Sequence, residues 1–162
     1  WATTPSAVGV IIAAASPSGL VAVRIGADRA MLIKEIVEEF PSSELTEDPE
    51  AMSDVLLALR ALARGDTAPD LPLDVRGTAF QARVWEALRR IPHGATTTYT
   101  DVAESLDAPH AVRAVAGACA HNRVALVVPC HRVLRRDGSL AGYAWGLEVK
   151  EQLLEAEASS AG

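Results

Sequence analysis

The chain has 162 residues, of which 49% are hydrophobic and 22% are charged, and its formal net charge is −6. This composition suits one or two folded domains and excludes wholesale disorder, and the apolar runs are too short to cross a bilayer, which takes about 20 residues. Two cysteines, Cys119 and Cys130, exclude a disulfide framework and a four-ligand zinc site, and they favour a reducing, intracellular setting.

A β-hairpin is predicted near the front of the chain. Residues 8–15 and 20–25 are rich in β-forming residues and are separated by Ser-Pro-Ser-Gly, a turn-forming cluster. A helix capped by Asp28 follows and ends before Pro41. Its apolar face is predicted to consist of Met31, Ile33, Ile36, Val37 and Phe40.

A second helix is predicted from about residue 50 to 64. Its apolar side chains at helical spacing are Met52, Val55, Leu56, Leu59 and Leu62. Residues 65–73 are rich in Gly, Asp and Pro, which indicates a linker, and residues 71–75 are predicted to form a short edge strand. We therefore expect an N-terminal α/β domain over residues 1–74 and a C-terminal domain over residues 75–162.

Four helices are predicted in the second half. The first covers residues 79–91 after a capping Thr78, and residues 100–106 and 109–120 form two shorter helical patterns. A tight turn joins these two patterns, which predicts a helix-turn-helix at about residues 99–121. The closing helix is predicted over residues 148–158. The core side of the first helix is predicted to contain Phe80, Val84, Trp85 and Leu88.

Cys130 is the first candidate for chemistry. An apolar strand is predicted over residues 125–128, and it leads directly into Pro129-Cys130-His131. A cysteine becomes a nucleophile when a neighbouring base or positive charge favours its thiolate. Because successive residues of extended chain point in opposite directions, His131 reaches the sulfur only if the chain bends after the strand. The Cys-His pair alone leaves a reactive thiol and an inert core cysteine equally open.

Basic residues are concentrated between residues 76 and 140. This segment holds nine arginines, five acidic residues and all four histidines, for a balance of +4, whereas residues 1–75 and 141–162 are acidic. Such local positive charge is typical of a surface that binds a polyanion. A solvated, arginine-rich helix would give the same count, so the charge alone does not decide between the two.

An ordered series of motifs surrounds Cys130. Pro-Cys-His-Arg-Val at residues 129–133 is followed by Asp-Gly, Gly-Tyr and Trp-Gly, and it is preceded by Arg-Gly-Thr-Ala-Phe, Val-Trp, Ile-Pro-His-Gly, Tyr99 and Ala-Val-Arg-Ala-Val. This series, which covers residues 74–157, resembles the O6-alkylguanine-DNA alkyltransferases. The helix that ends in Phe40-Pro41 makes the front half more similar to the carboxyl-terminal domain of the bacterial Ada type than to the shorter Ogt type.

The resemblance implies a mixed α/β (α+β) fold. A small N-terminal β-sheet domain with helices, ribonuclease-H-like, would precede a mainly helical domain that carries the helix-turn-helix and the active-site strand or loop. The implied activity is direct, irreversible transfer of the alkyl group from O6-methylguanine, and from O4-methylthymine, in double-stranded DNA to Cys130 in a single turnover. No metal or other cofactor and no membrane partner is implied, and the implied protein is a monomer of the bacterial cytoplasm.

The resemblance also assigns catalytic roles to individual residues. Cys130 would accept the alkyl group, and His131 would act as the base on its sulfur through a bound water. Glu157 would orient His131, in the manner of a nucleophile–base–orienter set. Asn122 would tie the turn that carries the helix to the active-site turn, and the hydroxyl of Tyr99 would help to protonate the leaving guanine.

Contacts with the DNA and with the lesion are implied as well. Arg113 would fill the space left by a flipped nucleotide, from a small-residue helix lying in the minor groove. Further DNA contacts are implied for Ala114, Thr100, Arg123 and Arg132. The pocket would be lined by Tyr143, Ala144, Trp145, Val133 and Cys119. The carbonyls of Cys130 and Val133 would bind the guanine amino group, the backbone near Ala144 would face O6, and Cys119 is not expected to react.

One departure and three alternatives stay open. Relatives of the Ada type commonly have an arginine at the position of Ala144, so the resemblance leaves the substrate range undetermined. A lesion-binding module would lack the cysteine, so Cys130 speaks against that class. A transcription factor would need base-reading side chains on the second short helix, and His110, Arg113 and alanines are a poor set for that task. A thiol hydrolase would not stay alkylated.

Overall fold

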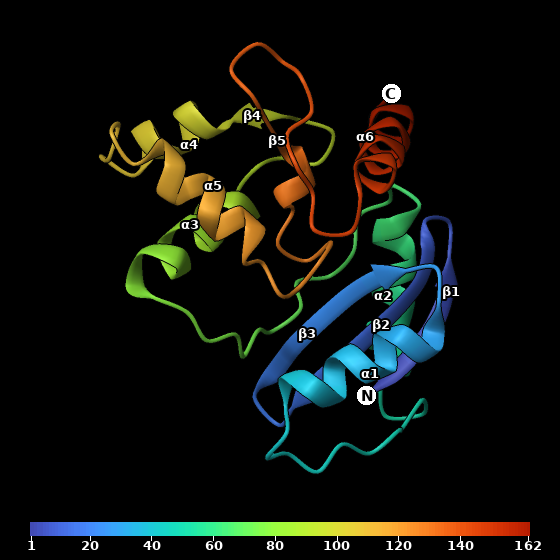
Figure 1. The fold of residues 1–162 in the computed structure, drawn as a ribbon. Coiled ribbons are helices and arrows are strands. Elements are labelled where there is room, and N and C mark those ends of the chain that lie inside the picture. Colours follow the sequence, from blue (N-terminus) through green and yellow to red (C-terminus); the bar gives the residue numbers. More distant parts are fainter.

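A three-stranded antiparallel sheet and six α-helices make up the computed structural model, which describes residues 1–162 (Figure 1). The sheet has the strand order β1-β2-β3, and a separate two-stranded pair joins β4 to β5 in parallel. The elements are β1 (Ala2–Ser6), β2 (Gly9–Ser16), β3 (Gly19–Gly26), α1 (Arg29–Glu39), α2 (Ser53–Ala63), α3 (Ala79–Arg89), β4 (Thr97–Thr98), α4 (Tyr99–Ser105), α5 (Val112–Ala120), the 3₁₀ turn η1 (Cys130–Arg132), β5 (Val133–Leu134) and α6 (Leu147–Ala161).

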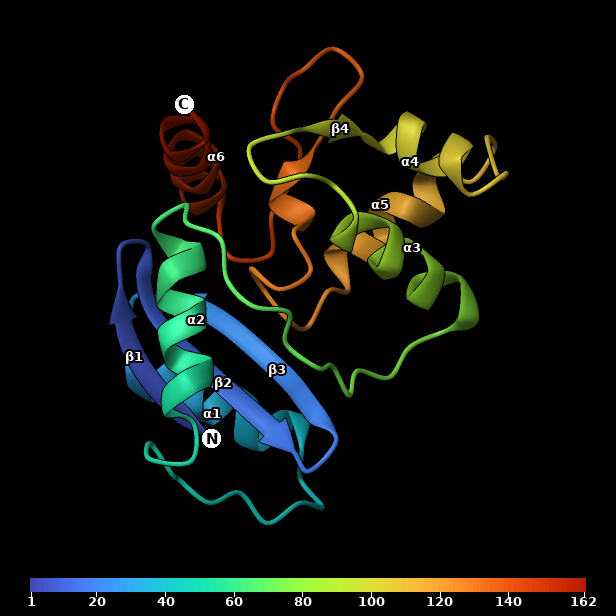
Figure 2. The same cartoon turned by 180° about the vertical axis from the view of Figure 1, so that it is seen from behind.

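The three-stranded sheet lies between α1 on one face and α2 on the other (Figures 1 and 2). Successive residues of β2 belong to two different cores: Ile12 and Ala14 pack with α1, whereas Ile11 and Ala13 join the larger core on the other face. Because both faces of the strand are covered, its sequence is an apolar run without polar alternation. The mixed α/β fold predicted from the sequence is confirmed, and its ribonuclease-H-like description stays a prediction.

The predicted hairpin is confirmed as β2 and β3, whereas β1, an edge strand that contains Pro5, was not predicted from the sequence. The cap of α1 is also confirmed, because the side chain of Asp28 accepts hydrogen bonds from the first helical amides. The predicted apolar face of α1 is partly wrong. Leu32 and Ile36 are buried, whereas Met31 and Val37 are 61% and 50% exposed. Only one narrow stripe of this helix meets the sheet.

Helices α3, α4 and α5 form a second group beside the sheet (Figure 2). Thr78 and Gln81 cap α3 reciprocally, and the indole Nε1 of Trp85 donates to the carbonyl of Ala118 in α5 at 2.9 Å. The two short helices of the predicted helix-turn-helix are present. The second begins at Val112 rather than residue 109, because the chain first passes through a turn that contains a left-handed Asp107 (φ 55°).

Two strands predicted from apolar runs are wrong. Residues 71–75 make only a single bridge, between Leu73 and Leu20. Residues 125–128 form a turn with Leu126 in the left-handed region (φ 71°), after one bridge between Val124 and Val23. The turn still places Ala125, Leu126 and Val128 in the main core, so a run of buried residues did not require an extended strand.

The free edge of β3 holds the start of this turn. The amide of Val23 donates to the carbonyl of Arg123 at 2.8 Å, and the amide of Ala125 donates to the carbonyl of Val23 at 3.1 Å. The sheet therefore fixes the segment that leads from α5 to Cys130. The largest core cluster contains side chains from both halves of the chain, and the domain boundary at residue 74 stays a prediction. No helix combines the length and the apolarity that a membrane span requires.

Candidate active site

Cys130 begins the 3₁₀ turn η1 and is 4% exposed. Asn122 organises the segment before it: the side-chain oxygen accepts from the amide of Val124 at 2.9 Å, and Nδ2 donates to the carbonyl of Val128 at 2.9 Å. The same Nδ2 lies 3.2 Å from the sulfur of Cys130 and donates to it. Asn122 therefore links the end of α5 to the cysteine, as its predicted role requires.

Tyr99 is brought to the same place by the pairing of β4 with β5. Thr97 pairs with Val133 and Thr98 with Leu134, so the residue after β4 lies beside the segment that follows Cys130. A cavity of about 530 Å³ opens between these segments, a size typical of small-molecule sites. It is lined by Cys130, Cys119, Tyr99, Tyr143, Ala144, Arg135, two alanines of α5, and Ala141 and Gly142 of the loop before α6. Of the predicted pocket residues, Val133 and Trp145 do not line this cavity. A larger hollow of about 810 Å³ beside α1 contains neither cysteine.

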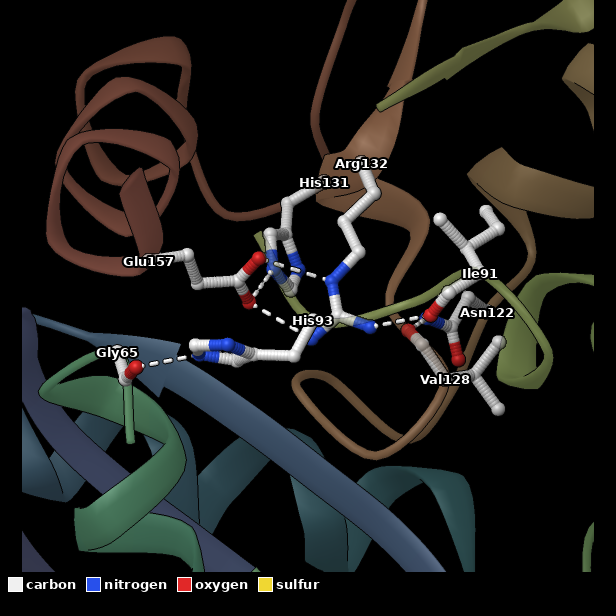
Figure 3. Close-up of polar contacts among 8 residues, drawn as sticks. All are labelled: Gly65, Ile91, His93, Asn122, Val128, His131, Arg132 and Glu157. Atoms are coloured by element: carbon white, nitrogen blue, oxygen red, sulfur yellow. Dashed lines mark hydrogen bonds and ion pairs between the residues drawn. The ribbon is translucent and has the colours of Figure 1, made fainter. Parts of the chain in front are cut away.

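His131 and Arg132, which follow Cys130 in η1, form a buried polar cluster with Glu157 (Figure 3). The carboxylate of Glu157, from α6, accepts a hydrogen bond from Nε2 of His131 at 2.7 Å. It also accepts hydrogen bonds from Nε and Nη2 of Arg132, each at 2.9 Å. The remaining guanidinium nitrogen Nη1 donates to the carbonyl of Ile91 at 2.8 Å. The cluster thereby joins α6, the active-site turn and the end of α3.

The ionisation of Glu157 fixes the tautomer of His131. Burial raises the pKa of Glu157, but the hydrogen bonds from His131 and Arg132 outweigh this effect and lower the pKa from 4.5 to about 2. An ionised carboxylate only accepts hydrogen bonds, so the Nε2 of His131 carries a proton. The other ring nitrogen, Nδ1, is buried and has no protein partner. In neutral His131 this nitrogen is a free base.

The thiol of Cys130 needs such a base. Burial raises its pKa, although the hydrogen bond from Asn122 and the charge of Lys150 act in the opposite direction. Burial also lowers the pKa of His131 and outweighs the hydrogen bond and the charge of Glu157, which raise it, while Arg132 and Lys150 add smaller lowering effects. At rest the cluster therefore favours a neutral thiol beside a neutral imidazole.

Lys150 is a site residue that the sequence analysis missed. Its side chain is fully buried, and Nζ donates to the carbonyl of Val133 at 2.7 Å. Burial lowers its pKa, and the two cysteines oppose that shift. A signal was present in the sequence, because Lys150, Leu153 and Glu157 follow the i, i+3, i+7 spacing of one helix face. A lysine on the buried face of a helix marks a position with a specific partner.

The other titratable groups of the cavity stay protonated. Burial and the neighbouring cysteines raise the pKa of Tyr99 to about 12, and burial and Cys130 raise that of Cys119 to about 12. Burial also raises the pKa of Tyr143, whose hydroxyl has no protein partner and whose ring meets that of Trp145 edge-on at 5.2 Å. Tyr99 is thus a proton donor facing the cavity, and Cys119 is a poor nucleophile.

The predicted DNA-contacting residues divide into two groups. Arg113 and Ala114 are exposed on α5, where the neighbouring Gly117 leaves open space, and Thr100 is half-buried in the first turn of α4. Arg123 instead points towards α1, where it pairs with Glu39 at 3.0 Å.

Arg132 does not fit its predicted DNA contact, because it is 8% exposed and is held on both sides by the protein. Arg135 was not predicted as a DNA contact. It is exposed at the rim of the cavity and makes no ion pair. Its position in the loop after β5 is decided by the pairing with β4.

The predicted guanine-binding carbonyls are already engaged. The carbonyl of Cys130 accepts from the amide of Val133, and that of Val133 accepts from Lys150. Each carbonyl oxygen keeps a second lone pair for a ligand.

The site thus combines a thiol, a buried base and a tyrosine donor around one cavity. No three His, Cys, Asp or Glu side chains are grouped so that they could hold a metal ion.

Comparison with known proteins adds to this geometry. Residues 79–159 match the family model described as 6-O-methylguanine DNA methyltransferase, DNA binding domain. The Escherichia coli protein named bifunctional transcriptional activator/DNA repair enzyme Ada is 44% identical over 161 residues, which are 99% of this chain and 46% of that protein. The chain thus spans about half the length of this relative.

Two further relatives are matched over most of their own length. The methylated-DNA–protein-cysteine methyltransferase of Mycobacterium bovis is 48% identical over 117 residues, which are 72% of this chain and 71% of that protein. The crystal structure of Mycobacterium tuberculosis OGT in complex with DNA superimposes with a TM-score of 0.82 at 39% identity, covering 98% of this chain and 92% of the other. Fold and sequence therefore agree in the family that they indicate.

Proposed function

The chain belongs to the 6-O-methylguanine DNA methyltransferase family, and from this membership we propose that it repairs alkylated DNA by transferring the alkyl group to its own Cys130. The observation that carries the proposal is the placement of the Cys130 sulfur at a cavity, hydrogen-bonded by Asn122 and next to the His131–Glu157 pair. The proposed substrate is O6-methylguanine in double-stranded DNA, and the protein acts as a monomer without a cofactor.

The first step is removal of the thiol proton. Burial keeps Cys130 protonated at rest, so the proton passes to Nδ1 of His131 through a bridging water. The imidazolium that forms is stabilised by Glu157 at 2.7 Å. The thiolate that forms is stabilised by the Nδ2–H of Asn122 and by the charge of Lys150.

Alkyl transfer is then an in-line displacement. The Sγ–C bond forms as the C–O6 bond breaks, and the electron pair of that bond stays on the guanine. The hydroxyl of Tyr99, which remains protonated because its pKa is about 12, donates its hydrogen bond to the departing base and helps to neutralise it. The thioether offers no leaving group for a return step, so each molecule reacts once. O4-methylthymine carries its alkyl group on an equivalent ring oxygen and is the proposed second substrate.

The lesion must leave the duplex to reach this cavity, because Cys130 is only 4% exposed. The exposed face of α5 is suited to the minor groove, since Ala114 and Gly117 allow a close approach to the DNA backbone. Arg113 lies on the same face and is proposed to occupy the space of the flipped nucleotide. Tyr143 and the backbone near Ala144 then enclose the base, and Trp145 contacts Tyr143 edge-on from outside the cavity.

Substitution of Arg113 by alanine is expected to slow repair of duplex DNA at least tenfold more than the reaction with free O6-benzylguanine. The free base needs no extrusion from a helix, whereas flipping costs a few kcal/mol of stacking and pairing. Single-turnover rates with both substrates measure this difference. Arg136→Ala, which removes an exposed arginine from a different loop, is the matched control. Equal slowing with both substrates would exclude Arg113 from base flipping.

The proposed activity is tested by intact mass before and after mixing with a duplex that contains one O6-methylguanine. We expect a gain of one methyl group per chain, located on the peptide that contains Cys130, and loss of the lesion from the DNA. Repaired DNA with unmodified protein would indicate a hydrolase. An unrepaired lesion that stays bound would indicate a lesion-binding protein. Either result would overturn the proposed transfer.

A further inference from the structure

Arg132 is the buried arginine next to the proposed base, and its guanidinium is bound by groups of the protein itself (Figure 3). Two of its nitrogens bind the two oxygens of Glu157 at 2.9 Å each, while a third donates to the carbonyl of Ile91. His131 donates to one of the same oxygens at 2.7 Å. Glu157 is therefore shared between a permanent cation and a titratable ring.

A histidine that shared a buried carboxylate with no cation would tend to become charged. An opposite charge at hydrogen-bond distance favours the imidazolium, and burial of the pair strengthens that attraction. An imidazolium carries a proton on both nitrogens and cannot accept another. Such a pair would raise the fraction of His131 that is already protonated while Cys130 is still a thiol, and that fraction could not take the thiol proton.

Arg132 removes this difficulty, because the guanidinium already balances the charge of Glu157 when His131 is neutral. A proton added to His131 would create a second cation on one carboxylate, with Lys150 nearby as a third positive charge. We propose that Arg132 is a positioning residue that keeps His131 neutral, with its proton on Nε2, so that Nδ1 is free to take the thiol proton. This inference rests on the proposed function, in which His131 is the base.

The surroundings of His131 agree with this assignment. Glu157 and Lys150 face it from α6, Arg132 and Cys130 belong to its own turn, and Tyr143 lies in the loop before α6 with a hydroxyl that stays neutral. Burial lowers the pKa of His131, the charges of Arg132 and Lys150 add to this effect, and Glu157 opposes it.

His93 is the other titratable group drawn in Figure 3, and its Nε2 is bound to the carbonyl of Gly65. His93 thus makes its hydrogen bond away from Glu157. Arg132 is the one cation that contacts the carboxylate shared with His131.

The test compares Arg132→Gln, which keeps a hydrogen-bond donor without the charge, with Arg132→Lys, which keeps the charge without the bidentate geometry. NMR follows the protonation of the His131 ring and gives its titration midpoint as the pH is varied. The protein used has not been exposed to any alkylated substrate. We expect a neutral Nε2–H ring in the wild type at pH 7. The midpoint should rise by about one pH unit or more in Arg132→Gln and by much less in Arg132→Lys. The acid limb of the transfer rate should move with it.

An unchanged midpoint in folded Arg132→Gln would overturn the inference, as would an equal rise in Arg132→Lys. If Arg132→Gln does not fold, the wild type decides: an imidazolium at pH 7 overturns the inference, and the neutral Nε2–H tautomer supports it. The NMR result is independent of alkyl transfer. If the wild-type protein does not transfer the alkyl group, the proposed function is overturned. That result can be distinguished from an NMR result that overturns the role of Arg132.

Discussion

Replacement of Cys130 by alanine is expected to abolish alkyl transfer while the fold and the DNA affinity stay close to those of the wild type. The sulfur is the proposed acceptor, and no second thiol in the cavity is reactive enough to replace it. Asn122 keeps its hydrogen bonds with Val124 and Val128 after the sulfur is removed, so the turn retains its main support. Arg113 and Ala114, the proposed DNA-contacting residues, lie on α5 and are unaffected.

Cys119→Ala is the matched control, because Cys119 lines the same cavity and its pKa is raised to about 12. This variant should transfer the alkyl group at a rate within a few-fold of the wild type. Transfer is measured by intact mass, DNA affinity by fluorescence anisotropy and folding by circular dichroism. Transfer that persists in Cys130→Ala would overturn the assignment of the acceptor. Loss of folding in that variant would instead make Cys130 a structural residue.

Substitution of Glu157 by alanine is expected to lower the free energy of unfolding by about 3–5 kcal/mol and to remove most of the transfer activity. Glu157 is 3% exposed and accepts three hydrogen bonds from His131 and Arg132. Its loss leaves the buried guanidinium without a counter-charge, and it frees the imidazole that it orients. Glu151→Ala, an exposed position on the same helix, should cost little. Chemical denaturation measures both variants, and equal losses would contradict the role of Glu157.

The same residue predicts how stability depends on pH. The pKa of Glu157 is lowered from 4.5 to about 2 in the folded protein, so the unfolded chain binds this proton more readily. Its stabilising contribution is therefore complete above about pH 4.5 and is lost as the pH falls towards 2. The free energy of unfolding of the wild type should decline across this range, and Glu157→Ala should show a shallower decline. Parallel curves for the two proteins would contradict the low pKa.

The ordered motifs around Cys130 were sufficient to identify the family, and the nucleophile, the base and the carboxylate were named from them. Asn122 and Tyr99 were named in the same way, and the structure places both at the cysteine. Hydrophobic patterns predicted the hairpin and the helices, because burial on one face imposes a repeat that the sequence carries. The cap at Asp28 was local in the same sense, since its partners lie two and three residues away.

The role of Arg132 was not predictable from the motif. Its position beside Cys130 in the sequence suggested a contact with DNA, whereas its side chain is directed to Glu157, which lies 25 residues further along the chain. The helical spacing of Lys150 indicated a buried position, but its partner is a backbone carbonyl that only the docking of α6 brings within reach. Each of these contacts joins elements that are distant in sequence.

The sequence alone determined which residue types are present, the local elements that repeat and cap themselves, and the family that the motifs indicate. Only the tertiary structure decided how residues 125–128 run, because the edge of β3 and the side chain of Asn122 convert an apolar segment into a turn. It also decided the electrostatic state of the site. The pKa values of Cys130 and His131 depend on burial and on charges from α6, and neither quantity is encoded in the spacing of the motif.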